Sequence, residues 1–134
     1  MFYIIEPEIA GVLGESTSLD TSTHPPVVTN LEFIIDSWLG DSIIESFPCF
    51  LVTKTLASNI SDIGVTGYEF DSANVVVSED YVDHRVPEFV WLKVNGKGGV
   101  DDFGLTEDFR LIVSQAVMEI LNINGLDHAE IERY

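Results

Sequence analysis

The sequence predicts a single α+β domain, residues 1–134, with a mixed or antiparallel sheet and two short helices. Three observations lead to this prediction. The chain has 134 residues, of which 46% are hydrophobic, so it matches the size of one domain and suffices for a buried core. Two stretches follow the same order of strand, helix cap, helix, glycine and strand. Several further stretches alternate apolar and polar residues, as half-buried strands do.

The N-terminal part of the chain contains short strand candidates separated by a long loop. Residues 2–5 are apolar and predict a first strand. Residues 11–26 are rich in glycine, serine, threonine and proline, and a loop of this length is expected to be functional or mobile. Residues 31–35 predict a second strand, and residues 43–47 a short edge element.

The first repeated unit follows directly. Residues 50–52 predict a strand, Thr53 is a suitable helix N-cap, and Gly64 marks the helix end. The helix buries one face, formed by Leu56 and Ile60. A closing strand is expected where Tyr68 and Phe70 alternate with acidic residues.

The middle of the chain predicts one more strand and an acidic loop. Residues 75–77 continue or follow the first unit, and residues 78–87 are polar and acidic. Residues 88–95 alternate, yet both faces are largely apolar, so this strand should be covered on both sides. One face carries Val90, Leu92 and Val94, and the other carries Phe89, Trp91 and Lys93.

The second unit repeats the first at a distance of 61 positions, from Thr53 to Ser114. Residues 111–113 predict a strand, Ser114 the N-cap, and Gly125 the helix end. The buried face of the helix is expected to consist of Val117, Ile120 and Leu121. Ala129 and Ile131 alternate with glutamates and predict a half-buried last strand. In this comparison Val52, Gly64 and Glu69 are identical to their counterparts, so duplication and coincidence both explain the match. The total is seven strands and two helices.

The charge of the chain restricts its partners. Twenty-three acidic residues face six basic ones, which gives a net charge of −17, and residues 1–53 contain no Lys or Arg. Nucleic acids and anionic membranes need basic patches, so neither is expected as a partner. A basic protein partner fits, because opposite charges accelerate encounter. Solubility or a salt-rich habitat explains the same charge without any partner.

The sequence contains no sign of export or membrane insertion. No apolar run is long enough to span a bilayer, and the N-terminus lacks the basic region of a signal peptide. The single cysteine, Cys49, lies between phenylalanines and is expected to be a buried, inert thiol. These features predict a cytoplasmic protein.

Motifs for catalysis or metal binding are missing. The three histidines are scattered, no G-x-S-x-G elbow occurs, and the glycines at 96–99 lack a P-loop frame. Asp101 and Asp102 form a candidate carboxylate pair, but neighbouring loop carboxylates are usually solvated. We therefore expect no catalytic residue, no metal and no cofactor. A small enzyme that uses the Asp101–Asp102 region remains an alternative.

Acidic residues accompany large aromatic residues in several predicted loops, a combination typical of protein interfaces. We expect the contacts with a partner to come from Asp36, Trp38, Asp41, Glu45, Asp101, Asp102, Phe103, Glu107 and Asp108. A third acidic loop contains Glu79, Asp80, Tyr81 and Asp83. Alternatively, Trp38 and Phe103 are hydrophobic plugs that pin their loops to the core.

Five stretches of the chain are similar to a known family. They are WLGDSIIESFPCFLVTKTLA (38–57), VTGYEF (65–70), VDDFGL (100–105), LIVSQAVMEIL (111–121) and HAEIERY (128–134), and together they cover most of residues 29–134. With these stretches the chain resembles a family of small immunity proteins that are encoded beside bacterial polymorphic toxins of the contact-dependent, Rhs or type VI kind. The resemblance implies a cytoplasmic protein without enzymatic activity that binds one cognate toxin domain and blocks it.

The expected function is therefore neutralisation of a toxin domain by occlusion of its active or substrate-binding site. The toxin is expected to be basic, such as a nuclease or an ADP-ribosyltransferase. The alternatives are a small enzyme and an acidic adaptor in a larger assembly.

Overall fold

The computed structural model describes residues 1–134 and contains two α-helices, one short 3-10 helix and thirteen strands. The helices are α1 (Lys54–Ile63), η1 (Glu79–Tyr81) and α2 (Gln115–Asn124). The strands are β1 (Phe2–Glu6), β2 (Gly11–Leu13), β3 (Ser18–Asp20), β4 (Val27–Asn30), β5 (Glu32–Ile35), β6 (Ile43–Ser46), β7 (Cys49–Thr53), β8 (Tyr68–Asp71), β9 (Asn74–Val77), β10 (Phe89–Val94), β11 (Phe103–Leu105), β12 (Leu111–Ser114) and β13 (Glu130–Arg133). The predicted α+β class is confirmed.

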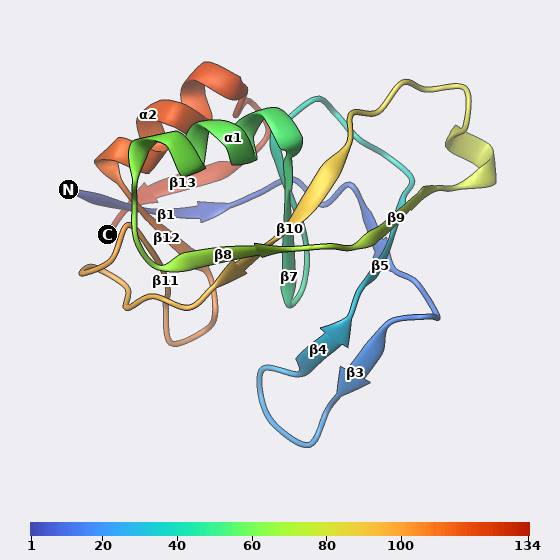
Figure 1. The fold of residues 1–134 in the computed structure, drawn as a ribbon, viewed down its shortest axis with the longest axis horizontal. Coiled ribbons are helices and arrows are strands. Elements are labelled where there is room, and N and C mark those ends of the chain that lie inside the picture. Colours follow the sequence, from blue (N-terminus) through green and yellow to red (C-terminus); the bar gives the residue numbers. More distant parts are fainter.

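The two predicted units exist, and they share one topology. In the first, the antiparallel hairpin β6–β7 leads through α1 to β8, and β10 inserts between β7 and β8. In the second, the hairpin β11–β12 leads through α2 to β13, and β1 inserts between β12 and β13. The strand orders are therefore β6-β7-β10-β8 and β11-β12-β1-β13, so the similarity extends from local sequence pattern to chain path (Figure 1).

Helix caps begin both helices where the sequence places them. Thr53 Oγ1 accepts a hydrogen bond from the N–H of Leu56 at 3.1 Å, and Ser114 Oγ accepts one from the N–H of Val117 at 3.4 Å. Gly64 ends α1 with a left-handed φ of 68°, a conformation that glycine adopts without steric cost. Local sequence thus fixes both ends of α1 and the start of α2.

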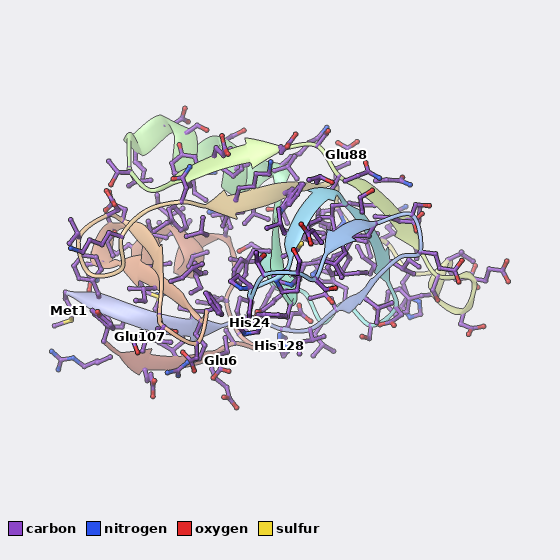
Figure 2. All side chains as sticks on the ribbon, turned by 90° about the horizontal axis from the view of Figure 1, so that it is seen from below. Met1, Glu6, His24, Glu88, Glu107 and His128 are labelled. Atoms are coloured by element: carbon purple, nitrogen blue, oxygen red, sulfur yellow. The ribbon has the colours of Figure 1, made fainter.

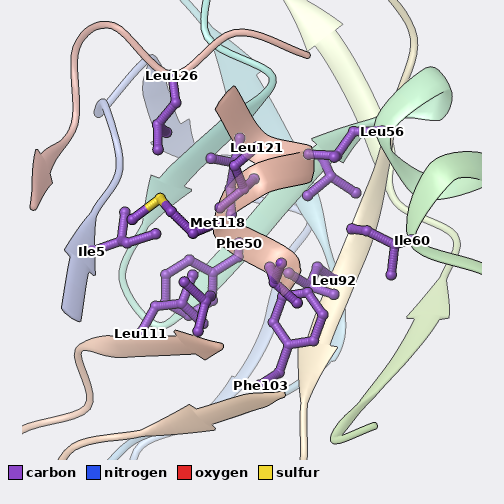
Figure 3. Close-up of a cluster of buried hydrophobic side chains, with 14 residues drawn as sticks. Ile5, Phe50, Leu56, Ile60, Leu92, Phe103, Leu111, Met118, Leu121 and Leu126 are labelled. Carbon is purple, nitrogen blue, oxygen red and sulfur yellow. The ribbon is translucent and has the colours of Figure 1, made fainter. Parts of the chain in front are cut away.

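The first core lies between the two helices and the two four-stranded sheets. Figure 3 shows side chains of α1 and α2 pointing towards those of β7, β11 and β12. Its 14 buried residues are Ile5, Ile43, Phe50, Val52, Leu56, Ile60, Leu92, Phe103, Leu111, Val113, Val117, Met118, Leu121 and Leu126. Five of the eight predicted core residues are fully buried, whereas Val90, Val94 and Ile120 pack against this core from partly exposed positions.

A second core lies on the other face of the β6-β7-β10-β8 sheet, beneath the mixed sheet β2-β5-β9. Successive strand residues point to opposite faces, so Phe50 and Val52 enter the first core while Cys49 and Leu51 enter the second. The members of the second core are Ala10, Leu31, Phe33, Ile35, Ile44, Cys49, Leu51, Phe89 and Trp91. The prediction that β10 is covered on both faces is confirmed, and Cys49 is buried as expected.

The predicted total of seven strands was wrong, since the chain forms thirteen, and three local predictions were wrong as well. Residues 11–26 are not one loop, because β2 pairs with β5 and β3 pairs with β4. The predicted loop that carries Asp101, Asp102 and Phe103 leads directly into β11, which includes Phe103 and pairs with β12. The last strand, β13, is exposed along its whole length rather than half-buried, and 46% of Ile131 remains exposed. Each difference depends on pairing or on an edge position, which local alternation does not encode.

Candidate functional site

Two of the predicted contact residues are buried and therefore not available to a partner. Only 1% of Asp41 and none of Phe103 is exposed. Phe103 lies on β11, and its ring packs at 5.5 Å from that of Tyr68 inside the first core. The prediction that both residues form contacts is wrong, because each side chain fills the protein interior.

Trp38 has a structural role, which agrees with the alternative prediction that it pins its loop to the core. Its indole Nε1–H donates to the carbonyl of Asp41 at 2.9 Å, and its ring meets Phe89 edge-on at 6.2 Å. The hydroxyl of Tyr81 donates to the Trp38 carbonyl at 2.8 Å. Trp38 thus anchors its loop to the second core.

Asp41 and Asp102 hold the two units together by reciprocal hydrogen bonds. Asp41 Oδ1 accepts from the N–H of Asp127, just after α2, at 2.8 Å. Asp102 Oδ2 accepts from the N–H of Thr66, just after α1, at 2.9 Å. Asp102 follows Asp41 by 61 positions, and Asp127 follows Thr66 by the same number. Each unit therefore uses the acid before its hairpin to close the turn after the other unit's helix.

The carboxylate of Asp102 accepts further hydrogen bonds that affect its pKa. Burial alone raises the pKa of Asp102, yet hydrogen bonds from Ser114 and Thr66 hold that pKa below its usual value. Ser114 Oγ donates to Asp102 Oδ1 at 2.6 Å. Asp101 accepts the N–H of Lys97 at 2.7 Å. Both carboxylates of the candidate acid–base pair are thus engaged in holding loops.

Asp41 belongs to a larger node in which Glu8 and His128 take part. Glu8, of which 5% is exposed, accepts the N–H of Asp41 and of Leu39, each at 2.9 Å. Asp41 also accepts the N–H of His128 at 2.8 Å and lies 3.0 Å from its Nδ1. The hydrogen bond to Asp41, with the charges of Asp41, Glu8 and Asp127, raises the pKa of His128 although desolvation lowers it.

This node is the group of side chains best placed to hold a metal, because the ligand atoms of Glu8, Asp41 and His128 lie within 4.8 Å of one another. All four carboxylate oxygens, however, already accept backbone N–H groups. Buried carboxylates satisfied in this way need no ion. These hydrogen bonds connect the N-terminal segment, the Trp38 loop and the turn after α2 to one another.

Three other predicted residues, Glu45, Glu107 and Asp108, lie close to an exposed aromatic cluster that sequence reasoning missed. The ring of His24 lies 5.2 Å from Phe109 and 6.1 Å from Phe47. His24 is exposed, Phe109 is half-buried, and 46% of Phe47 is exposed. Glu107 and Asp108 directly precede Phe109, and Glu45 precedes Phe47 by two positions.

Acidic residues continue from this cluster onto β1 and β13. Arg110 bridges the two regions, since its guanidinium contacts Asp108 at 3.0 Å and Glu132 at 2.9 Å. Glu6 faces Glu130 across the β1–β13 pair. Figure 2 shows Glu6, His24 and Glu107 along the same border of the molecule. The acid–aromatic face, as we name it, consists of Glu6, His24, Glu45, Phe47, Glu107, Asp108, Phe109, Glu130 and Glu132.

Four of the six acids of the acid–aromatic face, Glu6, Glu45, Glu107 and Glu130, have no basic partner. The basic side chains of Lys54, Lys93 and Arg110 form ion pairs with four acids, of which only Asp108 and Glu132 belong to this face. Burial, followed by repulsion from Glu6, raises the pKa of Glu45 to about 7. Desolvation is the larger cause of this shift, and the charge of Glu6 adds to it.

The turn that carries Phe109 has a strained backbone and several internal hydrogen bonds. Phe109 has a φ of 65°, a backbone conformation that residues other than glycine rarely adopt. The N–H of Phe109 donates to the Thr106 carbonyl at 2.9 Å, and the N–H of Thr106 donates to the Arg110 carbonyl at 2.9 Å. The N–H of Arg110 donates to Thr106 Oγ1 at 2.9 Å. These bonds support the backbone of the turn, and such strained positions concentrate at functional sites.

The remaining predicted residues do not join this face. Asp36 is exposed beside the Trp38 loop, where it accepts a hydrogen bond from Ser37. Glu79 and Asp80 are exposed on η1, the short yellow-green helix at the right of Figure 1, far from the orange turn after β11. No signal in the sequence joins His24, Phe47 and Phe109, because they come from three distant segments.

Comparison of the chain with protein-family models, with curated proteins and with solved structures finds no match. Both α-helices have ten residues, and none of the helices is long and apolar enough to cross a membrane.

Proposed function

We propose that the protein is a stoichiometric inhibitor, an immunity protein that binds one cognate bacterial toxin domain and occludes its active or substrate-binding site. The observation that carries this proposal is the cluster of His24, Phe47 and Phe109 beside acids, most of which have no basic partner. The resemblance to immunity proteins supports the same role, and it implies action in the cytoplasm without catalysis.

The composition of the face fits a basic protein surface as the partner. Aromatic side chains that enter a pocket supply most of the binding energy of an interface. Carboxylates around them accelerate encounter with Lys and Arg and pair with these residues in the complex. A toxin that binds nucleic acid or a phosphate-bearing substrate has a basic active site. An acidic face that covers this site would exclude the substrate by charge as well as by volume.

Rigidity of the Phe109 turn favours tight binding. Hydrogen bonds within residues 106–110 already fix its backbone, so little conformational entropy is lost when a partner docks. Binding of a basic surface would also remove the repulsion between Glu45 and Glu6, and it would lower the pKa of Glu45.

Rescue of bacterial growth tests the proposal. The toxin domain encoded by the neighbouring gene is expressed alone, with the wild-type protein, and with the variant Phe47→Ala/Phe109→Ala. We expect the wild type to restore growth and to copurify one-to-one, whereas the double variant fails although circular dichroism shows that it folds. The matched control Ile63→Ala/Val82→Ala removes two exposed apolar side chains elsewhere and should rescue fully.

The proposal is wrong if no toxin gene adjoins the gene for this protein, or if the wild type neither rescues growth nor binds the toxin domain. Equal rescue by both double variants would place the interface elsewhere on the protein.

A further inference from the structure

The strand β13 leaves one edge of the β11-β12-β1-β13 sheet open. It pairs with β1 on one side, and no strand of the chain pairs with its other side. All four of its residues are exposed. Figure 1 shows β13 in red beside β1 and near the C-terminus. Open edges present unpaired backbone groups that another strand can bind.

The backbone register identifies the free groups. The N–H of Tyr134 donates to the carbonyl of Phe2 at 3.0 Å, so the even-numbered residues of β13 point their backbone groups towards β1. In an antiparallel pair the intervening residues point the other way. The N–H and C=O groups of Ile131 and Arg133 therefore face outward and are available for a new ladder.

The side chains beside this edge define what fits there. Glu130 and Glu132 lie on one face of β13, together with Glu6 of β1, and Ile131 projects from the opposite face. A hollow of about 400 Å³ adjoins the strand and is lined by Ile4, Glu6, Glu130, Ile131 and Glu132. A strand with Lys or Arg at alternate positions would direct those side chains to the acids, and its apolar side chains would cover Ile131.

A second copy of this chain does not fit the same edge. In an antiparallel pair of two β13 strands, the residues whose backbone groups face outward must lie opposite one another. The two-fold axis of such a pair can therefore pass through Ile131, Glu132 or Arg133. The first register places Glu130 opposite Glu132, the second places Glu132 opposite Glu132, and the third places Arg133 opposite Arg133. Like charges directly opposite destabilise a sheet, and each copy carries a net charge of −17.

We propose that β13 binds a basic, extended strand of the partner, which becomes the fifth strand of the β11-β12-β1-β13 sheet. The identity of this partner as a toxin domain rests on the proposed function, whereas the strand addition rests on the edge itself. Glu130 and Glu132 belong to the acid–aromatic face, so the added strand would lie beside the docked aromatic cluster.

The test uses a short amidated peptide in which lysine alternates with valine, and amide hydrogen exchange of the full-length protein measured by NMR. Bound peptide should slow exchange at Ile131 and Arg133 by roughly tenfold or more, as expected for amides newly paired in a ladder. Phe70, the counterpart of Ile131 on β8, serves as the internal reference and should not change. A peptide that is N-methylated at alternate positions keeps the charges but cannot form the ladder, and it should protect neither amide.

Two variants at one position separate the backbone from the side chain. Ile131→Pro removes an outward N–H that β1 does not use, and edge positions tolerate proline. Ile131→Thr keeps that N–H and the branched side chain. We expect Ile131→Pro to lose peptide binding and Ile131→Thr to retain it, while both variants show the wild-type fold by NMR.

Unchanged exchange at Ile131 and Arg133 at saturating peptide, or equal binding by both variants, would overturn the strand addition. Growth rescue by the wild type would still uphold the proposed function in that case. Conversely, protection by the peptide without any toxin rescue would sustain the edge site and refute the toxin as its occupant.

Discussion

At the scale of single residues, some acids of this chain hold the fold together, whereas others are exposed and available to a partner. Asp41 and Asp102 are structural, because each accepts hydrogen bonds from the turn that follows the other unit's helix. Glu107 and Glu130 are exposed and have no basic partner within 4.0 Å. Sequence alone does not separate the two groups, since the neighbours that distinguish them are far away in the chain.

Removal of the buried Asp41 carboxylate should destabilise the protein. Asp41→Ala leaves the backbone N–H groups of Asp127 and His128 without acceptors, so we expect a loss of roughly 2–4 kcal/mol in the free energy of unfolding. Urea denaturation measures this loss. The control Asp36→Ala removes an exposed acid from the same loop and should change stability by less than about 0.5 kcal/mol. Equal effects of the two substitutions would contradict the clamp.

Glu45 should make stability depend on pH. Its pKa is about 7 in the folded protein, compared with the ordinary value of 4.5 that applies to the unfolded chain. Between these two pH values the folded state binds more protons than the unfolded state. The free energy of unfolding therefore falls as the pH rises from about 4.5 to about 7. The shift corresponds to at most about 3 kcal/mol, and solvent contact of the side chain reduces the expected effect to about 1–2 kcal/mol.

Comparison of Glu45→Gln with the wild type isolates this contribution. The variant should lose less stability than the wild type between pH 5 and pH 8, in urea titrations at both values. Parallel pH profiles for the two proteins would show that Glu45 does not titrate in this range.

At the scale of elements, both helices begin at a hydroxyl residue, but the two caps differ in what else they bind. Thr53→Ala should cost about 1 kcal/mol, as for a typical N-cap. Ser114→Ala should cost more, about 1–2 kcal/mol, because Ser114 also donates to Asp102 at 2.6 Å. Thermal or urea unfolding of both variants tests the order, and a smaller loss for Ser114→Ala would contradict it.

The two faces of α2 should respond differently to the same kind of truncation. Leu121 is fully buried in the first core, whereas 82% of Ile123 is exposed. Leu121→Ala should therefore cost roughly 2–5 kcal/mol, and Ile123→Ala should change stability by less than about 0.5 kcal/mol. Urea denaturation compares them directly, and a loss below about 0.5 kcal/mol at Leu121 would mean that its face of α2 is not the core face.

The elements that could be predicted from sequence are those with local signals. Cap residues, helical spacing and glycine stops place α1 and α2 correctly, and apolar residues on both faces identify β10 as a covered strand. The edge position of β13 and the pairing of β11 could not be predicted, because both depend on which distant strands lie beside them. Two of the predicted contact residues, Asp41 and Phe103, are buried for the same reason, since nothing near Phe103 in sequence distinguishes a buried ring from an exposed one.

At the scale of the whole molecule, two similar units share one core and exchange clamps. Each has a hairpin, a helix, a closing strand and an inserted strand, and the helices α1 and α2 pack against each other. The reciprocal bonds of Asp41 and Asp102 connect equivalent positions, which coincidence of loop residues would not produce at both sites. The repeated plan is therefore a property of the structure as well as of the sequence.

The same scale produces the acid–aromatic face, which no single segment contains. Its aromatic residues come from the connection between β3 and β4, the β6–β7 turn and the turn before β12. Its acids come from those turns, from β1 and from β13. The net charge predicts a basic partner from composition alone, but only the fold brings aromatic and acidic side chains to one place.

The association rate constant with the toxin domain encoded by the neighbouring gene, measured by stopped flow at several ionic strengths, tests the central claim most directly. A steered one-to-one encounter predicts a rate that falls as salt rises. The variant Glu107→Lys/Glu130→Lys should associate roughly tenfold more slowly at low salt and approach the wild-type rate at high salt. The control Glu79→Lys/Asp80→Lys makes the same charge change on η1 and should have a much smaller effect. A rate that is independent of salt, or equal slowing by both double variants, would contradict binding through the acid–aromatic face.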